Sequence, residues 1–173
     1  MLTAPALPAL LVVDDDPTIR AMFARALRDI ARVEVAASGG EAMRFLATQA
    51  FDLILLDLHM PVIDGFVVLQ MLASKPGPNH ATPVYVVSAD TSDSARVQAL
   101  KRHAVFFLTK PVPIGTLVAL VDMALKKKNA HKAQGAAAAA TPTPSPVEAG
   151  QGSAHAGAGA PQARTAAPLK PRG

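Results

Sequence analysis

The sequence predicts an α/β fold in which helices cover both faces of a parallel sheet. Five strand signals, four of them short apolar runs, alternate with segments of helical periodicity between residues 9 and 125. This alternation is typical of βαβ units, whose crossovers are right-handed. The four apolar runs also stop at a polar or charged residue, which marks the end of a strand. We therefore expect a doubly wound, three-layer sandwich of five parallel strands and five helices.

The first strand and helix are sharply marked. The apolar run Ala9–Val13 ends on three aspartates, and Pro17 then opens a helix. Proline is favoured at the first helical position, and the aspartate before it can cap the helix. Apolar residues follow at spacings of three and four, which predicts a helix with one face on the sheet: Ile19, Met22, Phe23, Ala26, Leu27 and Ile30.

A second strand and helix follow. The residues Val33–Val35 alternate in polarity, as expected of a partly exposed strand toward the edge of a sheet. The segment Ser38-Gly39-Gly40-Glu41 then leads into a helix. Its inward side chains are expected to be Met43, Leu46 and Ala47.

The next apolar run is the centre of the predicted sheet. Leu53–Leu56 is too short and continuous for an amphipathic helix, and it suits a strand that is covered on both faces. The run delivers Asp57 to a turn that Pro61 and Asp64-Gly65 close. A third helix is expected over residues 66–73.

Two more strands complete the sheet, at Val84–Val87 and Val105–Leu108. Residues 90–101 between them indicate a weak helix with Val97 and Leu100 as its only large apolar anchors, and weak anchoring predicts mobility. A last amphipathic helix is indicated by apolar residues at helical spacing: Ile114, Leu117, Val118, Val121 and Leu125.

Composition divides the chain into a leader at residues 1–8, a folded domain at 9–128 and a tail at 129–173. The tail is rich in alanine, proline and glycine and has few bulky side chains, which predicts disorder. Residues 1–125 carry a net charge of −2 and residues 126–173 one of +6, so the basic pI belongs to the tail. The lysines at 126–128 would suit nucleic acid or a membrane surface, although charge runs are usually solvated.

Several protein classes are excluded by composition. The chain has no cysteine, which excludes disulfides and thiolate chemistry. No apolar stretch reaches the roughly 18 residues of a membrane span, and residues 1–13 lack the basic n-region of a signal peptide. The histidines show no zinc-ligand spacing. A cytoplasmic protein is therefore expected.

The residues that follow the strands form one candidate site, because the carboxyl ends of parallel strands emerge at the same edge of a sheet. Asp14 and Asp15 follow the first strand, Asp57 the third, Ser88 the fourth and Lys110 the fifth. Crowded carboxylates need a cation, and an oxygen-only ligand set suits Mg²⁺. The set favours phosphoryl transfer with Asp57 as nucleophile, and with Ser88 and Lys110 binding phosphoryl oxygens.

Four motifs on these strand ends resemble the receiver domain of two-component response regulators. They are VVDDDP at 12–17, LLDLHMPVIDG at 55–65, VVSAD at 86–90 and FFLTKPV at 106–112, and the resemblance spans residues 9–127. It implies a flavodoxin-like sheet with strand order 2-1-3-4-5. It also implies that Asp57 accepts a phosphoryl group from a histidine kinase or phosphotransfer protein in a phosphorelay. Such a chain is expected to assist its own phosphorylation and dephosphorylation, with no separate enzymatic output domain.

The resemblance also implies a magnesium site. Asp15 and Asp57 would bind the metal directly. Asp14 would bind it through water, and the backbone carbonyl of His59 would complete the set. His59 and Asp90 stand at variable positions that border the site, and they are expected to tune how long the phosphoryl group survives. Arg102-His103-Ala104 stands where the family often has a glycine, which predicts a reshaped loop.

A switch is implied by two further residues. Ser88 would move toward the phosphoryl group, and Phe107 would then turn inward. The surface of the fourth helix, fifth strand and fifth helix would change, and an effector is expected to bind there. The Lys110-Pro111 bond is expected to be cis.

Two other functions are kept as alternatives. A metal-dependent phosphatase would need a second acid–base carboxylate and a substrate-capping segment, and the sequence shows neither. A receiver-regulated adaptor would instead bind nucleic acid through the basic tail, with a steep dependence on salt.

Overall fold

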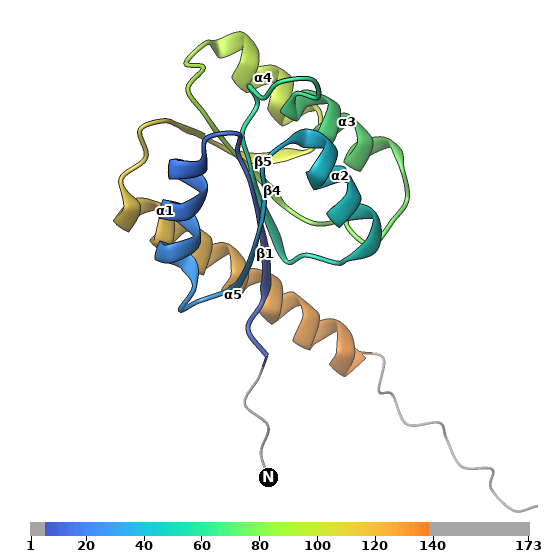
Figure 1. Ribbon diagram of the computed structural model, residues 1–173. Helices are drawn as coiled ribbons and strands as arrows, with labels where there is room; N and C mark the ends of the chain where they lie inside the picture. Colours follow the sequence, from blue (N-terminus) through green and yellow to red (C-terminus); the bar gives the residue numbers. More distant parts are fainter. Residues whose placement is uncertain (1–5, 139–173) are drawn as a thin grey trace, which may run out of the picture. The chain divides into compact units, whose positions relative to one another are not determined.

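A five-stranded parallel sheet forms the centre of the computed structural model, which describes residues 6–138 and the side chains up to residue 130 (Figure 1). The strands are β1 (Ala9–Val13), β2 (Arg32–Ala36), β3 (Leu53–Leu56), β4 (Val84–Ser88) and β5 (Ala104–Thr109). The helices are α1 (Pro17–Leu27), α2 (Gly39–Thr48), α3 (Gly65–Ser74), α4 (Asp93–Lys101) and α5 (Ile114–Ala138). The strand order is β2-β1-β3-β4-β5, which confirms the expected topology and the edge position of β2.

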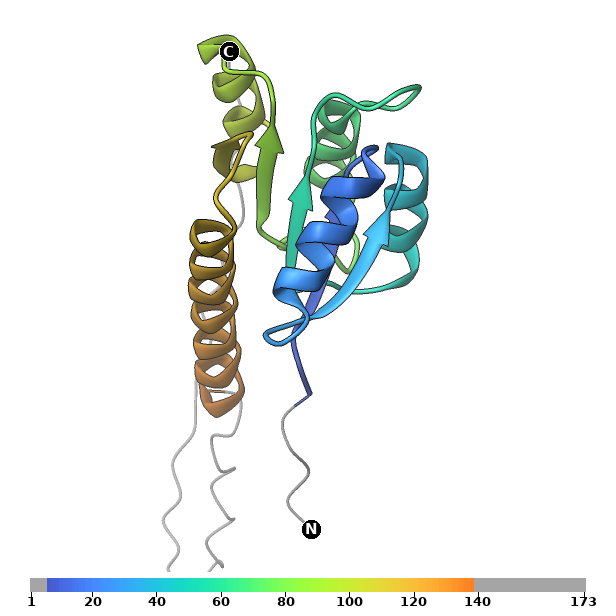
Figure 2. The same ribbon diagram turned by 60° about the vertical axis from the view of Figure 1, so that its left-hand side comes forward.

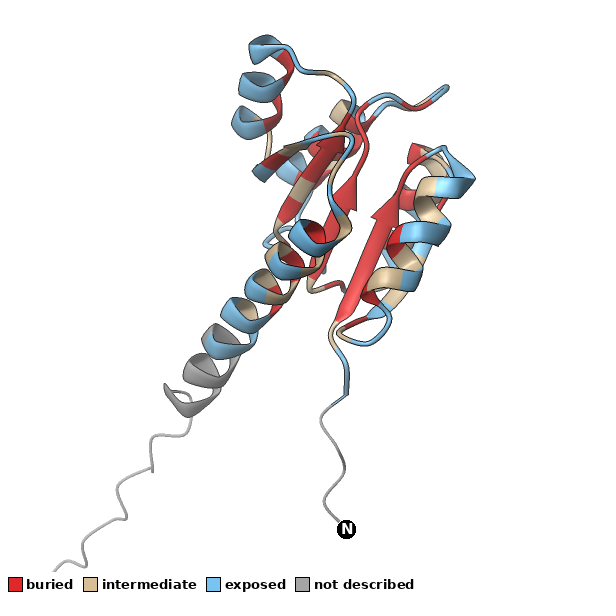
Figure 3. Cartoon of the chain, turned by 90° about the vertical axis from the view of Figure 1, so that its left-hand side faces the viewer, coloured by how far each residue is buried: buried red, intermediate tan, exposed pale blue. Residues whose placement is uncertain are grey.

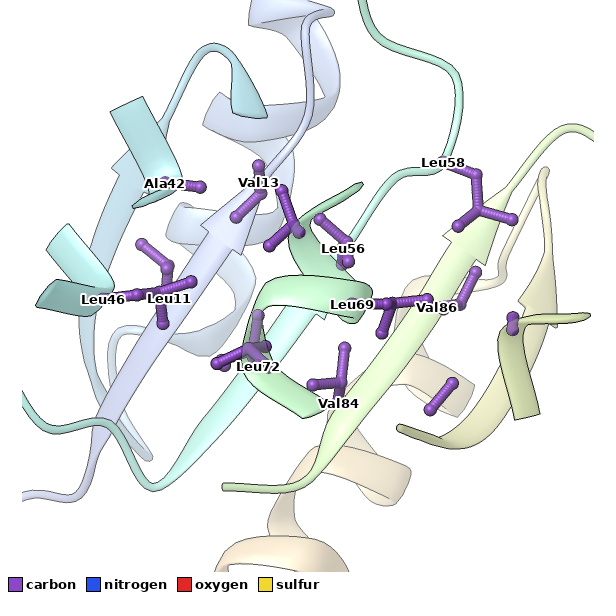
Figure 4. Packing of buried hydrophobic residues seen from close by; sticks show 14 of the residues in the cluster. Leu11, Val13, Ala42, Leu46, Leu56, Leu58, Leu69, Leu72, Val84 and Val86 are labelled. Carbon is purple, nitrogen blue, oxygen red and sulfur yellow. The ribbon is translucent and has the colours of Figure 1, made fainter. Parts of the chain in front are cut away.

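Helices cover both faces of the sheet. α1 and α5 lie on one face, and α2, α3 and α4 lie on the other (Figure 1, Figure 2). Because side chains alternate along a strand, the two faces have separate cores. In β3, Ile54 and Leu56 join the core beneath α2 and α3, part of which Figure 4 shows, whereas Leu53 and Leu55 join the other core. β3 is therefore buried on both faces, and the outer surfaces of the helices are exposed (Figure 3).

Side-chain caps fix where the helices begin. The Asp16 carboxylate accepts hydrogen bonds from the N–H groups of Thr18 and Ile19, and Pro17 occupies the first turn of α1 as predicted. The helices α2, α3 and α4 are capped in the same way by Ser38, Asp64 and Ser92. Each cap contributes about 1 kcal/mol by accepting hydrogen bonds from backbone N–H groups of the first turn.

Helix α4 packs through a different face from the one predicted. Val97 and Leu100, its expected anchors, are 46% and 45% exposed, whereas Ala95 and Ala99 are buried in the core that contains β5 residues. The two alanines are four residues apart and so lie on one face of the helix, and this face packs against the sheet. The expected anchors are therefore wrong. The conclusion that α4 buries little apolar surface still holds, because two methyl groups anchor it.

Two smaller differences concern α2 and α5. In α2 the buried side chains are Ala42 and Leu46, and Ala47 is exposed. α5 continues past the expected domain boundary at residue 128 to Ala138, because alanine, lysine and glutamine are strong helix formers. The rest of the expected tail, residues 139–173, lies outside the described residues. Within residues 6–138, no helix combines the length and apolarity needed to span a membrane.

The chain enters β5 through an irregular backbone. His103 has a φ of 124°, a conformation that glycine adopts freely and that costs other residues free energy. Its imidazole Nε2 lies 3.1 Å from the carbonyl oxygen of Thr82, and this hydrogen bond holds the turn. The register between β4 and β5 then skips Val105, which forms a β-bulge. A histidine thus shapes the loop where a glycine is common.

Candidate functional site

Four strand ends bring charged and polar side chains to the carboxyl edge of the sheet. Asp14 and Asp15 follow β1 and Asp57 follows β3, and carboxylate oxygens of all three lie within 4.8 Å of one another. Asp14 and Asp57 are 2% and 6% exposed, whereas Asp15 is exposed. Ser88 ends β4 and is buried, and Lys110 follows β5. The residues selected in the sequence therefore share one edge.

Lys110 binds two of the carboxylates. Its Nζ donates hydrogen bonds to Asp14 Oδ2 at 2.6 Å and to Asp57 Oδ2 at 2.8 Å. Backbone bonds hold these strand ends in place, because the Asp57 N–H donates to Val13 O at 2.9 Å and the Lys110 N–H to Ser88 O at 2.8 Å. The Lys110-Pro111 peptide bond is cis, as expected. The lysine ammonium is thus a fixed cation that bridges two strand ends.

Burial and ion pairing act in opposite directions on Asp14 and Lys110. Burial raises the pKa of Asp14 and outweighs the hydrogen bonds from Lys110 and from the Asp16 N–H, which lower it. Burial alone would lower the pKa of Lys110, but the bonds to Asp14 and Asp57 outweigh it and raise that pKa. Lys110 therefore stays protonated beside the carboxylates.

The loop from Asp57 to α3 approaches the site closely. A Cβ atom at position 65 would lie 2.2 Å from the Asp57 carbonyl oxygen, so only Gly65 fits there. Farther along the loop, Val62 has a φ of 69° at the centre of a turn in which the Ile63 N–H donates to Pro61 O at 2.8 Å. The Asp64-Gly65 turn predicted from the sequence is thus a place where the backbone passes close to Asp57.

Two loops meet across the site through His59 and Asp90. The His59 N–H donates to Asp57 Oδ1 at 3.3 Å, and His59 Nε2 lies 3.2 Å from Asp90 Oδ2. The Asp90 N–H donates to Ser88 Oγ at 3.3 Å. The Asp90 carboxylate also accepts from the Ser92 N–H at 2.8 Å, which is the main reason that the pKa of Asp90 is lowered. The sequence indicated that both residues border the site, but not that they bind each other.

Two more side chains lie near the site. Arg20, which lies outside the predicted apolar stripe of α1, donates from Nη1 to Asp14 O at 2.5 Å and so supports the first acidic loop. A basic residue six positions after the first aspartate is the signal that could have revealed it. Phe107 is 7% exposed and packs in the core that contains the buried alanines of α4, and its turning on phosphorylation stays a prediction.

A doubly wound sheet with three carboxylates and a lysine at its carboxyl edge defines a receiver-type signalling domain. The model of the family described as the response regulator receiver domain matches residues 10–122. The chain belongs to this family, whose members are the receivers of two-component systems.

Relatives and solved structures agree with this assignment. The transcriptional regulatory protein PrrA of Mycobacterium leprae is 38% identical over 124 residues, which cover 71% of this chain and 52% of that protein. The response regulator protein PilR of Pseudomonas aeruginosa is 38% identical over 120 residues, 69% of this chain and 26% of that protein. A Francisella response regulator receiver domain has a TM-score of 0.64 and 32% identity, covering 69% of this chain and 98% of that one. This chain thus spans 52% or less of these two curated relatives.

Proposed function

We propose that this protein accepts a phosphoryl group on Asp57 from a histidine kinase or a phosphotransfer protein in a phosphorelay. The observation that carries the proposal is the Lys110 ammonium, which bridges Asp14 and Asp57 within a cluster of three carboxylates. An ammonium fixed beside a strand-end carboxylate stabilises the negative charge of an incoming phosphoryl group. Membership of the receiver family supports the same role.

Asp57 is the nucleophile in the proposed reaction. One of its carboxylate oxygens attacks the phosphorus of a phosphohistidine, so that a P–O bond forms while the P–N bond breaks and the leaving imidazole takes a proton from solvent. Lys110 exchanges a carboxylate oxygen for a phosphoryl oxygen, and the Ser88 hydroxyl donates to another. Water later cleaves the acyl phosphate, which releases inorganic phosphate and regenerates the carboxylate.

The donor set fits Mg²⁺. Three carboxylates with oxygens within 4.8 Å, and no sulfur or imidazole among them, suit a hard cation that keeps several waters. Asp15 and Asp57 would bind the ion directly, Asp14 through water and His59 through its carbonyl oxygen. A bound divalent ion neutralises charge that the carboxylates and the phosphoryl oxygens share.

Acetyl phosphate tests the proposed acceptor. The native chain and Asp57→Asn are incubated with acetyl phosphate and Mg²⁺, and their intact masses are compared. The native chain should gain a labile mass of about 80 Da, one phosphoryl unit, and Asp57→Asn should gain none. No addition to the native chain, or the same addition to both, would count against the acceptor role.

The raised pKa of Asp14 gives a test of the metal site. A buried carboxylate with a raised pKa contributes stability only at low pH, and this stability is lost as pH rises through the folded-state pKa. At neutral pH without Mg²⁺, Asp14→Asn should therefore unfold at a higher temperature than the native chain. Added Mg²⁺ should raise the native midpoint and raise that of Asp14→Asn much less. If Mg²⁺ raised the unfolding midpoint of both proteins equally, Asp14 would not take part in binding the metal.

The partner surface is proposed for α4, β5 and α5. Its support is the group of exposed apolar side chains on two adjacent elements, Val97 and Leu100 on α4 and Val105 and Phe106 on β5. Exposed apolar groups of this kind mark interaction surfaces when they adjoin one another. The loosely anchored α4 would let phosphorylation change their arrangement.

The nucleic-acid alternative has weaker support. Lys126 pairs with Asp122 at 2.6 Å and Lys128 with Asp52 at 3.5 Å, so two lysines of the basic run have acidic partners within the domain. Binding in a gel-shift experiment that disappeared on deleting residues 126–173, with a steep salt dependence, would favour this alternative.

A further inference from the structure

We propose that His59 and Asp90 form a latch that ties the β4–α4 loop to the β3–α3 loop until Asp57 is phosphorylated. Asp90 is then the positioning residue through which the event at Asp57 reaches α4. This inference rests on the proposed phosphorylation of Asp57 and adds the specific contact that must break for the switch to operate.

Hydrogen bonds lead without interruption from Asp57 to the start of α4. The His59 N–H holds Asp57 Oδ1 at 3.3 Å, and the His59 imidazole meets Asp90 Oδ2 at 3.2 Å. The other Asp90 oxygen accepts from the Ser92 N–H at 2.8 Å, and Ser92 Oγ in turn caps α4 by accepting from the Ala95 N–H at 3.2 Å. A change in the His59–Asp90 contact therefore acts directly on the residue that caps α4.

Asp90 also holds the buried hydroxyl of the site. Its N–H donates to Ser88 Oγ at 3.3 Å, while its carboxylate binds His59. Asp90 thus contacts both the β3–α3 loop and the end of β4. Movement of Ser88 toward a phosphoryl oxygen would draw Asp90 with it, and departure of His59 would leave Asp90 free to follow.

The phosphoryl group supplies the competition that opens the latch. It carries about two negative charges and three strong acceptor oxygens, against the single charge of Asp90. The His59 backbone N–H is bound to the Asp57 carboxylate, so His59 lies next to the residue that would carry the phosphoryl group. The side chains of His59 and Asp90 are 59% and 26% exposed, so both can move without disturbing the core. α4 can follow them, because Ala95 and Ala99 are its only buried residues.

A double-mutant cycle on beryllofluoride affinity tests the latch. His59→Ala removes the imidazole and keeps the backbone bond to Asp57. Asp90→Ser keeps an oxygen near the Ser92 N–H but is too short to reach position 59. Affinities for beryllofluoride in the presence of Mg²⁺ are measured from amide spectra for the native chain, both single variants and the double variant.

His59→Ala alone should bind beryllofluoride about two- to five-fold more tightly, the range expected when one partly exposed contact between side chains is lost. In the Asp90→Ser background, the same substitution should give no gain or a loss, because no latch remains to be broken. The same gain in both backgrounds, or no gain in the single variant, would overturn the latch.

His80→Ala is the matched control, because it removes a histidine from the α3–β4 loop at a distance from the site. Without any ligand, His59→Ala should shift the amide signals of residues 92–95 at the start of α4, and His80→Ala should not. A native chain that fails to bind beryllofluoride would contradict the proposed phosphorylation as well as the latch. Native binding with additive substitutions would contradict the latch alone.

Discussion

The helices before and after β5 are held in opposite ways. α5 buries Leu117, Val121 and Leu125, each at most 3% exposed, whereas α4 buries only Ala95 and Ala99 and leaves its larger apolar residues in solvent. Since stability follows the apolar area removed from water, α5 is fixed by the core and α4 is free to respond to its loops. The amount of buried apolar surface, and not the regularity of the helix, decides which element an event at the site can move.

The largest expected effect comes from replacing a buried leucine of α5 with alanine, and the same replacement in α4 is the comparison. Leu117→Ala should destabilise the fold by about 2–5 kcal/mol, because it leaves a cavity in the core. Leu100→Ala should change stability by less than about 0.5 kcal/mol, because that side chain is exposed. Urea unfolding followed by circular dichroism measures both. Similar losses in the two variants would show that α4 is anchored as firmly as α5.

Hydrogen exchange sharpens the comparison at the level of the backbone. Amides of residues 97–101 in α4 should exchange through local opening, with an opening free energy roughly 2 kcal/mol or more below that of residues 117–125 in α5, which should approach the global value. The measurement is native-state exchange at increasing urea. If both helices opened only with global unfolding, the contrast between them would disappear.

The smallest effects concern the turn that follows α4. His103→Ala should cost about 1–2 kcal/mol, because alanine keeps the unfavourable positive φ and loses the bond to Thr82 O. His103→Gly loses the same bond but relieves the strain, so its net change should be within about 1 kcal/mol of zero. Thermal unfolding compares the variants. Equal losses of stability in the two variants would show that the positive φ at position 103 does not destabilise the native chain.

The fold and the main site could be predicted because they depend on short, local signals. The apolar runs form the strands. The parallel topology then brings Asp14, Asp57, Ser88 and Lys110 to one edge, whatever the conformation of the loops between them. The continuous run Leu53–Leu56 likewise required burial on both faces. The comparisons agree with the family that these signals indicated.

The contacts between loops could not be predicted in the same way. Val97 and Leu100 are the larger apolar residues of α4, but the face that packs inward carries Ala95 and Ala99 instead. The His59–Asp90 contact and the Arg20 bond to Asp14 O depend on how separate loops and helix starts approach each other. No spacing rule within one element reports such distances.

The Lys110 ammonium gives the site a simple charge balance. Three carboxylates and one ammonium sum to a formal charge of −2, which a single divalent cation would cancel. A phosphoryl group carries about two negative charges, but it replaces the single charge of the Asp57 carboxylate, so phosphorylation of the cation-bound site would change its formal charge from zero to about −1. A partner could sense this change at a distance set by the roughly 8–10 Å reach of charge in salt solution.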